Sequence, residues 1–201
     1  MALRACAAAV CAGAVLAAGC GGSGGGTRPA AAPPQHFAGV RVPPDSPATD
    51  FALRDQSGHL VRLSAERGRL VLLTFLYTHC VDVCPLIAGN LNRAVAGLGP
   101  ESRSVRILAV SVDPVGDTPA AVRSYVAEHR LLPQFRWLLG TRAQLAPVWQ
   151  AYNVLIQVGS AELVRHGAPI LLLDRQGRPL LFYRSTVPAA AVLHDLRLLI
   201  R

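Results

Sequence analysis

A nearly continuous apolar run covers residues 70–76, and it predicts a β-strand buried on both faces. A short polar turn follows, and the apolar spacing from about Val83 to Leu98 then predicts a helix. A second apolar run rich in β-branched residues, Val105–Val112, predicts another strand of the same kind. The strand, turn and helix that begin at Leu70 form the stretch around which the rest of the chain is organised.

Shorter patterns complete the order of elements. A helix is expected to start at Pro119, because Thr118 suits the N-cap and proline suits the first helical position. The turns at 55–58 and 174–177 each lie between two strand candidates. Strands are predicted at Phe51–Leu53, Leu60–Leu63, Arg136–Leu139, Leu163–Val164, Ile170–Leu173 and Pro179–Tyr183, and helices at 119–129, 141–152 and 188–200.

This order predicts an α/β protein with a thioredoxin-like fold: a central mixed sheet flanked by helices, with an N-terminal β-hairpin extension. The chain has 201 residues, which leaves room for one domain of ordinary size with a substantial core once a leader is removed.

The first 48 residues are predicted to lie outside this domain. Residues 1–20 have the pattern of an export signal, in which Arg4 precedes the apolar segment Ala5–Ala18, too short for a membrane span of roughly 20 residues. Leu16–Cys20 resembles a bacterial lipobox, so Cys20 would be lipidated; ordinary cleavage after a small residue is the alternative. Residues 21–48, rich in Gly, Pro and Ala, are predicted to be a flexible tether, and residues 49–201 the folded domain.

The charge of the chain argues against one class of partner. The formal net charge is +8, and all 20 basic residues are arginines. They are scattered along the sequence instead of being clustered, so we do not expect nucleic-acid binding. A weak attraction to anionic lipid or to an acidic protein face stays open.

Five cysteines divide between the leader and the domain, where only Cys80 and Cys84 remain. Both lie at the predicted junction between strand and helix, and a helix N-terminus can lower a cysteine pKa from about 8.5 to roughly 3.5–7.5. If both lay in the first turn, their spacing would place them on one face, about 6 Å apart along the axis. That arrangement suits a disulfide or a shared metal ion, whereas two buried structural thiols are the alternative.

A soft metal such as Cu(I) accepts two sulfurs and one imidazole, so the histidines are candidates for a third ligand. His166 is the best of them, because it lies in the polar break 165–169 before an apolar strand. In a thioredoxin-like fold that loop packs against the cysteine loop. A merely solvated His166 is the competing interpretation. His79 adjoins Cys80, but neighbouring side chains diverge at a turn, so tuning of the thiolate suits it better than ligation. The others are His36, His59, His129 and His194.

Three blocks of the sequence resemble the Sco/SenC family of copper-binding proteins. The segment 77–85 resembles the family's Cys-x-x-x-Cys-Pro motif, and 111–119, with its Asp-Pro and Asp-Thr-Pro, resembles a second signature. The segment 163–183 resembles the third, which contains the ligand histidine. The blocks keep the family's order and cover roughly residues 50–201.

This resemblance implies copper, as Cu(I), Cu(II) or both, bound by Cys80, Cys84 and His166. Asp82 and Asp113 occupy acidic positions typical of the family, with plain turn and capping roles as the alternative. Three departures are visible: Val81 stands where Pro is usual, Gly167 follows the histidine where Ser is common, and the segment between residues 152 and 166 is short.

The resemblance also implies a function: an exported metallochaperone, lipid-anchored at the outer face of the cytoplasmic membrane, that helps mature the dinuclear copper site of cytochrome c oxidase. Its partners would be the copper-site subunit of the oxidase and other copper chaperones or thiol reductases. The alternative is an enzyme, a thiol-disulfide oxidoreductase in which Cys80 attacks, Cys84 resolves and His166 is dispensable. A peroxide-handling or redox-signalling protein is a third hypothesis that nothing in the sequence specifically requires.

Overall fold

A computed structural model of the chain describes residues 36–154, 156–158, 164–166 and 168–201. The chain divides into two units, Met1–Pro34 and Gln35–Arg201, and the fold described below is that of the second. Cys20 and the rest of the predicted leader lie outside the described residues. Within the described residues, no helix is both long and apolar enough to cross a membrane.

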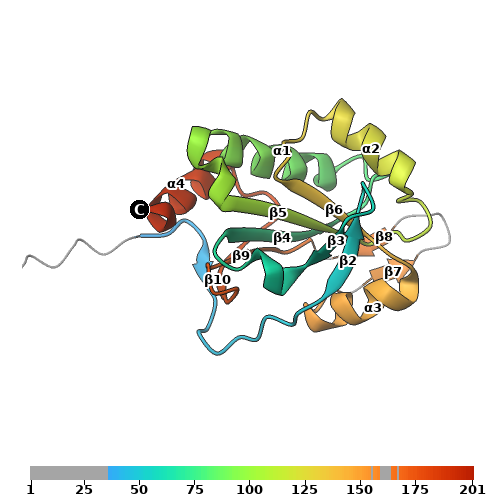
Figure 1. Cartoon of the computed structure of the whole chain (residues 1–201), viewed down its shortest axis with the longest axis horizontal. Coiled ribbons are helices and arrows are strands. Elements are labelled where there is room, and N and C mark those ends of the chain that lie inside the picture. Colours follow the sequence, from blue (N-terminus) through green and yellow to red (C-terminus); the bar gives the residue numbers. More distant parts are fainter. Residues whose placement is uncertain (1–35, 155, 159–163, 167) are drawn as a thin grey trace, which may run out of the picture. The chain divides into compact units, whose positions relative to one another are not determined.

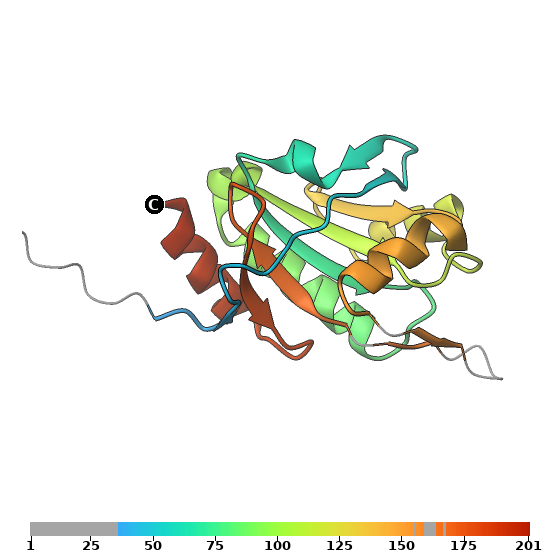
Figure 2. The same cartoon turned by 90° about the horizontal axis from the view of Figure 1, so that it is seen from below.

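The centre of the fold is an eight-stranded mixed sheet with the strand order β1-β10-β9-β4-β5-β6-β2-β3 (Figures 1 and 2). All seven residues of β4 are buried, because strands lie on both sides of it and helices cover both faces. β4 runs parallel to β5, with Leu70 opposite Val105 and Leu76 opposite Ser111, and antiparallel to β9. The strands are β1 (Val40–Arg41), β2 (Ala52–Asp55), β3 (Leu60–Arg62), β4 (Leu70–Leu76), β5 (Val105–Ser111), β6 (Phe135–Leu139), β9 (Ile170–Leu173) and β10 (Pro179–Tyr183).

Helices cover both faces of this sheet. α1 (Val83–Ala96) and α4 (Ala189–Ile200) pack against each other on one face, together with α2 (Pro119–Glu128), and α3 (Arg142–Ala151) lies on the other (Figures 1 and 2). Two 3₁₀ turns, Leu63–Glu66 and Gly99–Ser104, lead into β4 and β5. The predicted α/β thioredoxin-like fold is confirmed, and β2 and β3 form the expected N-terminal hairpin.

Local sequence signals set most helix boundaries. Thr118 caps α2, because its Oγ1 accepts a hydrogen bond from the Ala121 amide at 3.1 Å. Thr141 and Gln144 form a capping box at the start of α3. α1 ends at Ala96, two residues before the predicted Leu98. Gly97 is its C-cap, and Gly99, at φ +60°, then turns the chain into the 3₁₀ segment.

Residues 36–48, which composition assigned to the tether, lie against the domain. β1 pairs with β10, and the amides of Ala38 and Gly39 each donate to the Asp195 carboxylate at 2.9 Å. The Tyr183 hydroxyl donates to the same fully buried carboxylate. Gly39 is required there, because a Cβ would press into the Tyr183 ring. Composition alone missed this contact, since the carboxylate that holds the segment is contributed by the last helix.

A separate two-stranded sheet differs from the prediction in the region of the proposed third ligand. β7 (Ile156–Val158) was not predicted, and it pairs antiparallel with β8 (Val164–His166), with Ile156 opposite His166. The backbone of His166 therefore ends a strand instead of lying in an irregular polar break. Gly167 lies outside the described residues.

Candidate dithiol and metal centre

The two cysteines lie where β4 turns into α1. β4 ends at Leu76, and Cys84 is the second residue of α1. Cys80 precedes the helix, but the chain folds back so that the Cys84 amide donates to the Cys80 Sγ at 3.3 Å. Both residues are free thiols; the exposed fraction is 7% for Cys80 and 0% for Cys84. The structure thus brings the predicted pair together with one thiol at the surface side and one beneath it.

The sulfur of Cys80 occupies the place of a helix cap. Asp82 stands at the N-cap position of α1, yet its exposed side chain makes no capping hydrogen bond. One of the unpaired amides of the first turn, that of Cys84, is instead satisfied by the Cys80 sulfur. Val81, which is 96% exposed, and Asp82 form the rim between the two thiols. A capping role for Asp82 is therefore wrong in this structure.

The same contacts make the two thiols chemically unequal. Burial opposes the charged form of Cys80, but hydrogen bonds from the Cys84 thiol, from the amides of Cys84 and Asp82 and from Tyr77 outweigh it and lower the pKa of Cys80. Burial raises the pKa of Cys84 well above its usual range, and the hydrogen bond to Cys80 adds to that rise. Burial and the neighbouring Cys80 raise the pKa of Tyr77 to about 12, so its hydroxyl stays protonated. Cys80 is therefore the more easily ionised thiol of the pair.

A buried carboxylate fixes the turn that carries Cys80. Asp117 Oδ1 accepts hydrogen bonds from the Thr78 amide at 2.8 Å and from the Thr78 hydroxyl at 2.7 Å. Its Oδ2 accepts from the Ser111 hydroxyl at 2.6 Å and from the Trp137 indole at 3.4 Å. Burial raises the pKa of Asp117, although the hydrogen bonds from Ser111 and Thr78 oppose that rise. One side chain thus ties the end of β4 to β5 and β6.

The hydrogen bonds from Thr78 to Asp117 are called the clamp below. Asp113, four positions before Asp117, faces His79. The Asp113 Oδ2 is 3.9 Å from His79 Nδ1, and its Oδ1 accepts from the amides of Val115 and Gly116. Gly116 permits the approach, because a Cβ there would press into the Asp113 carboxylate and the His79 ring. His79, Asp113 and Asp117 have donor atoms within 4.8 Å of one another. Both oxygens of Asp117 already accept hydrogen bonds from the protein, so this cluster does not by itself indicate a metal site.

The hydrogen bonds between Asp117 and Thr78 were not predicted from the sequence. The available signal was the spacing of two aspartates four residues apart directly after β5, in the segment 113–117. Such a spacing can place a carboxylate back over the strand end. It does not say that the donors would come from Thr78, which is 39 residues away in the chain.

The third predicted ligand is placed by its backbone only. Ile170, which starts β9, pairs with Thr74 near the end of β4, so the chain enters β9 at the edge of the sheet where the cysteine turn begins. Ile170 is four positions after His166, a span of at most about 14 Å of chain. The structure describes the backbone of His166 but not its side chain. Its ligation of a metal with Cys80 and Cys84 stays a prediction.

The other histidines with described side chains have roles elsewhere. His59 Nδ1 lies 3.6 Å from Asp55, the His129 ring packs on Tyr125 with 4.0 Å between centroids, and His194 Nε2 lies 3.2 Å from the carbonyl of His36. Among the described side chains, His79 is therefore the only imidazole near the dithiol, and its recorded partners are Thr78 and Asp113.

The fold and the site together define a class: thioredoxin-like proteins in which a central strand delivers a dithiol to a helix N-terminus. Comparison with known proteins narrows this class. The SCO1/SenC family model matches residues 42–201. The chain therefore belongs to the SCO1/SenC family.

Three relatives show how far the similarity extends. The mitochondrial protein SCO2 homolog of Bos taurus is 37% identical over 136 residues, which are 64% of this chain and 50% of that protein, so the chain spans about half the length of this relative. The structure of Bradyrhizobium japonicum ScoI with copper bound is 30% identical, with a TM-score of 0.68, over 75% of this chain and 98% of that one. The solution structure of apo Sco1 from Thermus thermophilus is 34% identical, with a TM-score of 0.70, over 82% of this chain and 97% of that one.

The inequality of the thiols predicts an order of alkylation in the reduced, metal-free chain. With limiting iodoacetamide at pH 7, we expect Cys80 to be modified several times faster than Cys84, because only the thiolate reacts and the pKa of Cys80 is the lowered one. The rate at Cys80 should rise with pH only up to its lowered pKa and then level off. Peptide mapping by mass spectrometry measures both rates.

Two controls accompany this measurement. In guanidinium chloride both cysteines should react at similar rates, because the hydrogen bonds and the burial are lost. Cys84→Ala removes the side-chain donor to Cys80, so it should slow alkylation of Cys80 at pH 7. Equal rates in the folded chain, or earlier modification of Cys84, would contradict the assignment.

Proposed function

We propose that this chain is an exported copper metallochaperone that is tethered to the membrane and helps to mature the dinuclear copper site of cytochrome c oxidase. One observation carries the proposal: a buried, hydrogen-bonded pair of thiols at the strand–helix junction of a Sco-family domain. Thiolates are the ligands that Cu(I) prefers, and a pair joined by a hydrogen bond lies within reach of a single ion. The copper-bound relative supports the choice of metal.

In this proposal Cys80 and Cys84 supply two sulfur ligands and His166 supplies a nitrogen. Copper is the cargo, so the site must also release it. A trigonal site leaves one direction open for a thiolate of the acceptor, and the exposed rim at Val81 and Asp82 lies beside the outer thiol, Cys80. Asp117 acts behind the ligands, because it holds Thr78 and thereby the turn that carries Cys80.

A second candidate function is thiol-disulfide exchange on the cysteines of the oxidase copper site. The observation that favours it is the division of the pair into a thiol with a lowered pKa and a buried one with a raised pKa. Exchange needs an attacking thiolate at Cys80 and a resolving thiol at Cys84. This function needs no imidazole, so His166 separates the two candidates.

We predict that the reduced chain binds about one Cu(I), and that Cys80→Ser, Cys84→Ser and His166→Ala each weaken binding at least tenfold, because each removes one of three ligands. Titration against a chromophoric Cu(I) chelator measures affinity, and oxidase activity in a strain that carries each variant measures maturation. Val81→Ala, at an exposed position between the cysteines, is the matched control and should bind normally.

The pattern of losses decides between the candidates. Loss of copper binding and of oxidase maturation in all three ligand variants supports the metallochaperone. If His166→Ala retained full maturation while both cysteine variants lost it, the exchange function would replace the metallochaperone. Unchanged Cu(I) affinity in Cys80→Ser would contradict copper binding at this site.

The predicted anchor allows a separate test of localisation. We expect the chain to fractionate with the membrane through a lipid on Cys20, and Cys20→Ser to release it or to leave it unprocessed, because the lipid is attached to that sulfur. Fractionation combined with mass spectrometry of the mature N-terminus measures both. Cys11→Ser, in the same leader, should have no effect, and membrane attachment of a processed Cys20→Ser chain would contradict the lipid anchor.

A further inference from the structure

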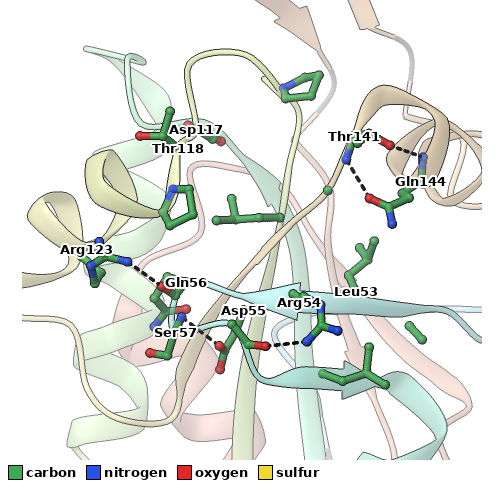
Figure 3. Close-up of a pocket in the computed structure, with 17 residues that line it drawn as sticks. Leu53, Arg54, Asp55, Gln56, Ser57, Asp117, Thr118, Arg123, Thr141 and Gln144 are labelled. Carbon is green, nitrogen blue, oxygen red and sulfur yellow. Dashed lines mark hydrogen bonds between the residues drawn. The ribbon is translucent and has the colours of Figure 1, made fainter.

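An open pocket of about 760 Å³ is lined in part by Asp117, the residue that holds Thr78 in the turn that carries Cys80 (Figure 3). Its walls come from the β2–β3 hairpin, from the segment 114–119 and from the start of α3. Asp117 belongs to both regions, since it lines the pocket and also accepts the two hydrogen bonds from Thr78. The pocket therefore shares a residue with the hydrogen bonds that hold the turn of Cys80.

Two arginines at the pocket have their guanidinium groups held by backbone carbonyls. Arg54 Nη1 donates to the Gly58 carbonyl at 2.8 Å, and Arg123 Nη1 donates to the Gln56 carbonyl at 3.2 Å (Figure 3). Neither forms an ion pair with any acidic side chain in the part of the chain that the structure describes. Each guanidinium keeps further N–H donors in a rigid fork that matches a carboxylate.

The acidic side chains that line the pocket do not neutralise these arginines. Asp55 is 2% exposed and its carboxylate pairs with Arg136 at 3.1 Å. Asp117 is 4% exposed, and both its oxygens are engaged by Thr78, Ser111 and Trp137. The charge that the lining presents to solvent is consequently positive.

Much of the remaining lining is apolar or uncharged. The side chains of Thr118 and Thr141 accept hydrogen bonds from the first turns of α2 and α3. Leu60, which is 61% exposed, together with Pro114 and Leu139 supplies apolar surface. The positively charged donors that line the pocket are the two guanidinium groups of Arg54 and Arg123.

We propose that this pocket docks an acidic segment of the protein that exchanges copper with the chain, and this inference rests on the proposed function. Charge complementarity carries it: two preorganised arginines lack acidic partners in a chain of net charge +8. Because Asp117 is shared with the clamp on Thr78, a segment seated here brings its own protein alongside Cys80. The pocket binds the acidic segment of the partner, and Cys80 and Cys84 hold the copper that is exchanged.

The test uses the full-length reduced chain and, as the probe, the purified soluble domain that bears the dinuclear copper site of the oxidase. We expect the double variant Arg54→Glu/Arg123→Glu to weaken binding of this domain at least about tenfold at low ionic strength, and to reduce the salt dependence of the affinity. The neutral double variant Arg54→Gln/Arg123→Gln should fall between it and the natural chain. Isothermal titration calorimetry measures the affinities.

A matched control reverses two arginines at the other end of the sheet. Arg103 precedes β5 and Arg175 follows β9, and the structure pairs those strand ends with Leu70 and Val71 at the start of β4. Arg103→Glu/Arg175→Glu changes the net charge equally and should retain the affinity. Equal weakening in the control and pocket variants, or no binding of the domain to the natural chain, would overturn the docking proposal.

Copper titration of the same variants separates this proposal from the proposed function. The pocket variants should still bind about one Cu(I), so a loss of docking with normal copper binding supports the pocket alone. Absence of copper binding in the natural chain would refute the proposed function instead. Vesicles of phosphatidylglycerol and phosphatidylcholine form a further arm: if the pocket substitutions abolished vesicle binding but left domain binding intact, the pocket would serve a lipid surface and the proposal would be overturned.

Discussion

The hydrogen bond from the Cys84 amide to the Cys80 sulfur is the interaction on which the chemistry of this domain depends. It exists because the buried strand β4 ends at Leu76 and the chain folds back over the start of α1 before the helix continues. A sulfur takes the place of a capping oxygen, and the helix amide stabilises its negative charge. The result is a pair in which Cys80 is the more easily ionised thiol and Cys84 is held protonated beneath it.

This geometry suits both candidate functions because both need a thiolate at Cys80. A metal ligand and an attacking nucleophile each require the deprotonated sulfur. They differ in what must come next: a second sulfur and an imidazole for copper, or a resolving thiol alone for exchange. Asp117 serves either chemistry, because its four hydrogen bonds fix the turn whatever the cysteines do.

Much of the fold could be predicted from local sequence. The seven buried residues of β4 follow from an apolar run, and the starts of α2 and α3 follow from Thr118 and Thr141, whose caps act within three residues. The features that were missed depend on contacts distant in sequence. Thr78 and Asp117 are 39 residues apart, and the segment at Ala38 is held by Asp195, 157 residues away. The spacing of apolar residues along the chain does not indicate which distant residues form such contacts. The Cys80–Cys84 pair was predictable because only three residues separate its members, but which thiol would be the more acidic depended on burial and on the fold of the turn.

The central claim is that the strand–helix junction begins a copper site that a distant imidazole completes. X-ray absorption at the copper K edge of the reduced chain, loaded with one equivalent of Cu(I), tests it most directly. The account predicts a first coordination shell of two sulfurs and one nitrogen, with the nitrogen lost in His166→Ala. A shell with fewer than two sulfurs, or a nitrogen contribution that persists unchanged in His166→Ala, would contradict it.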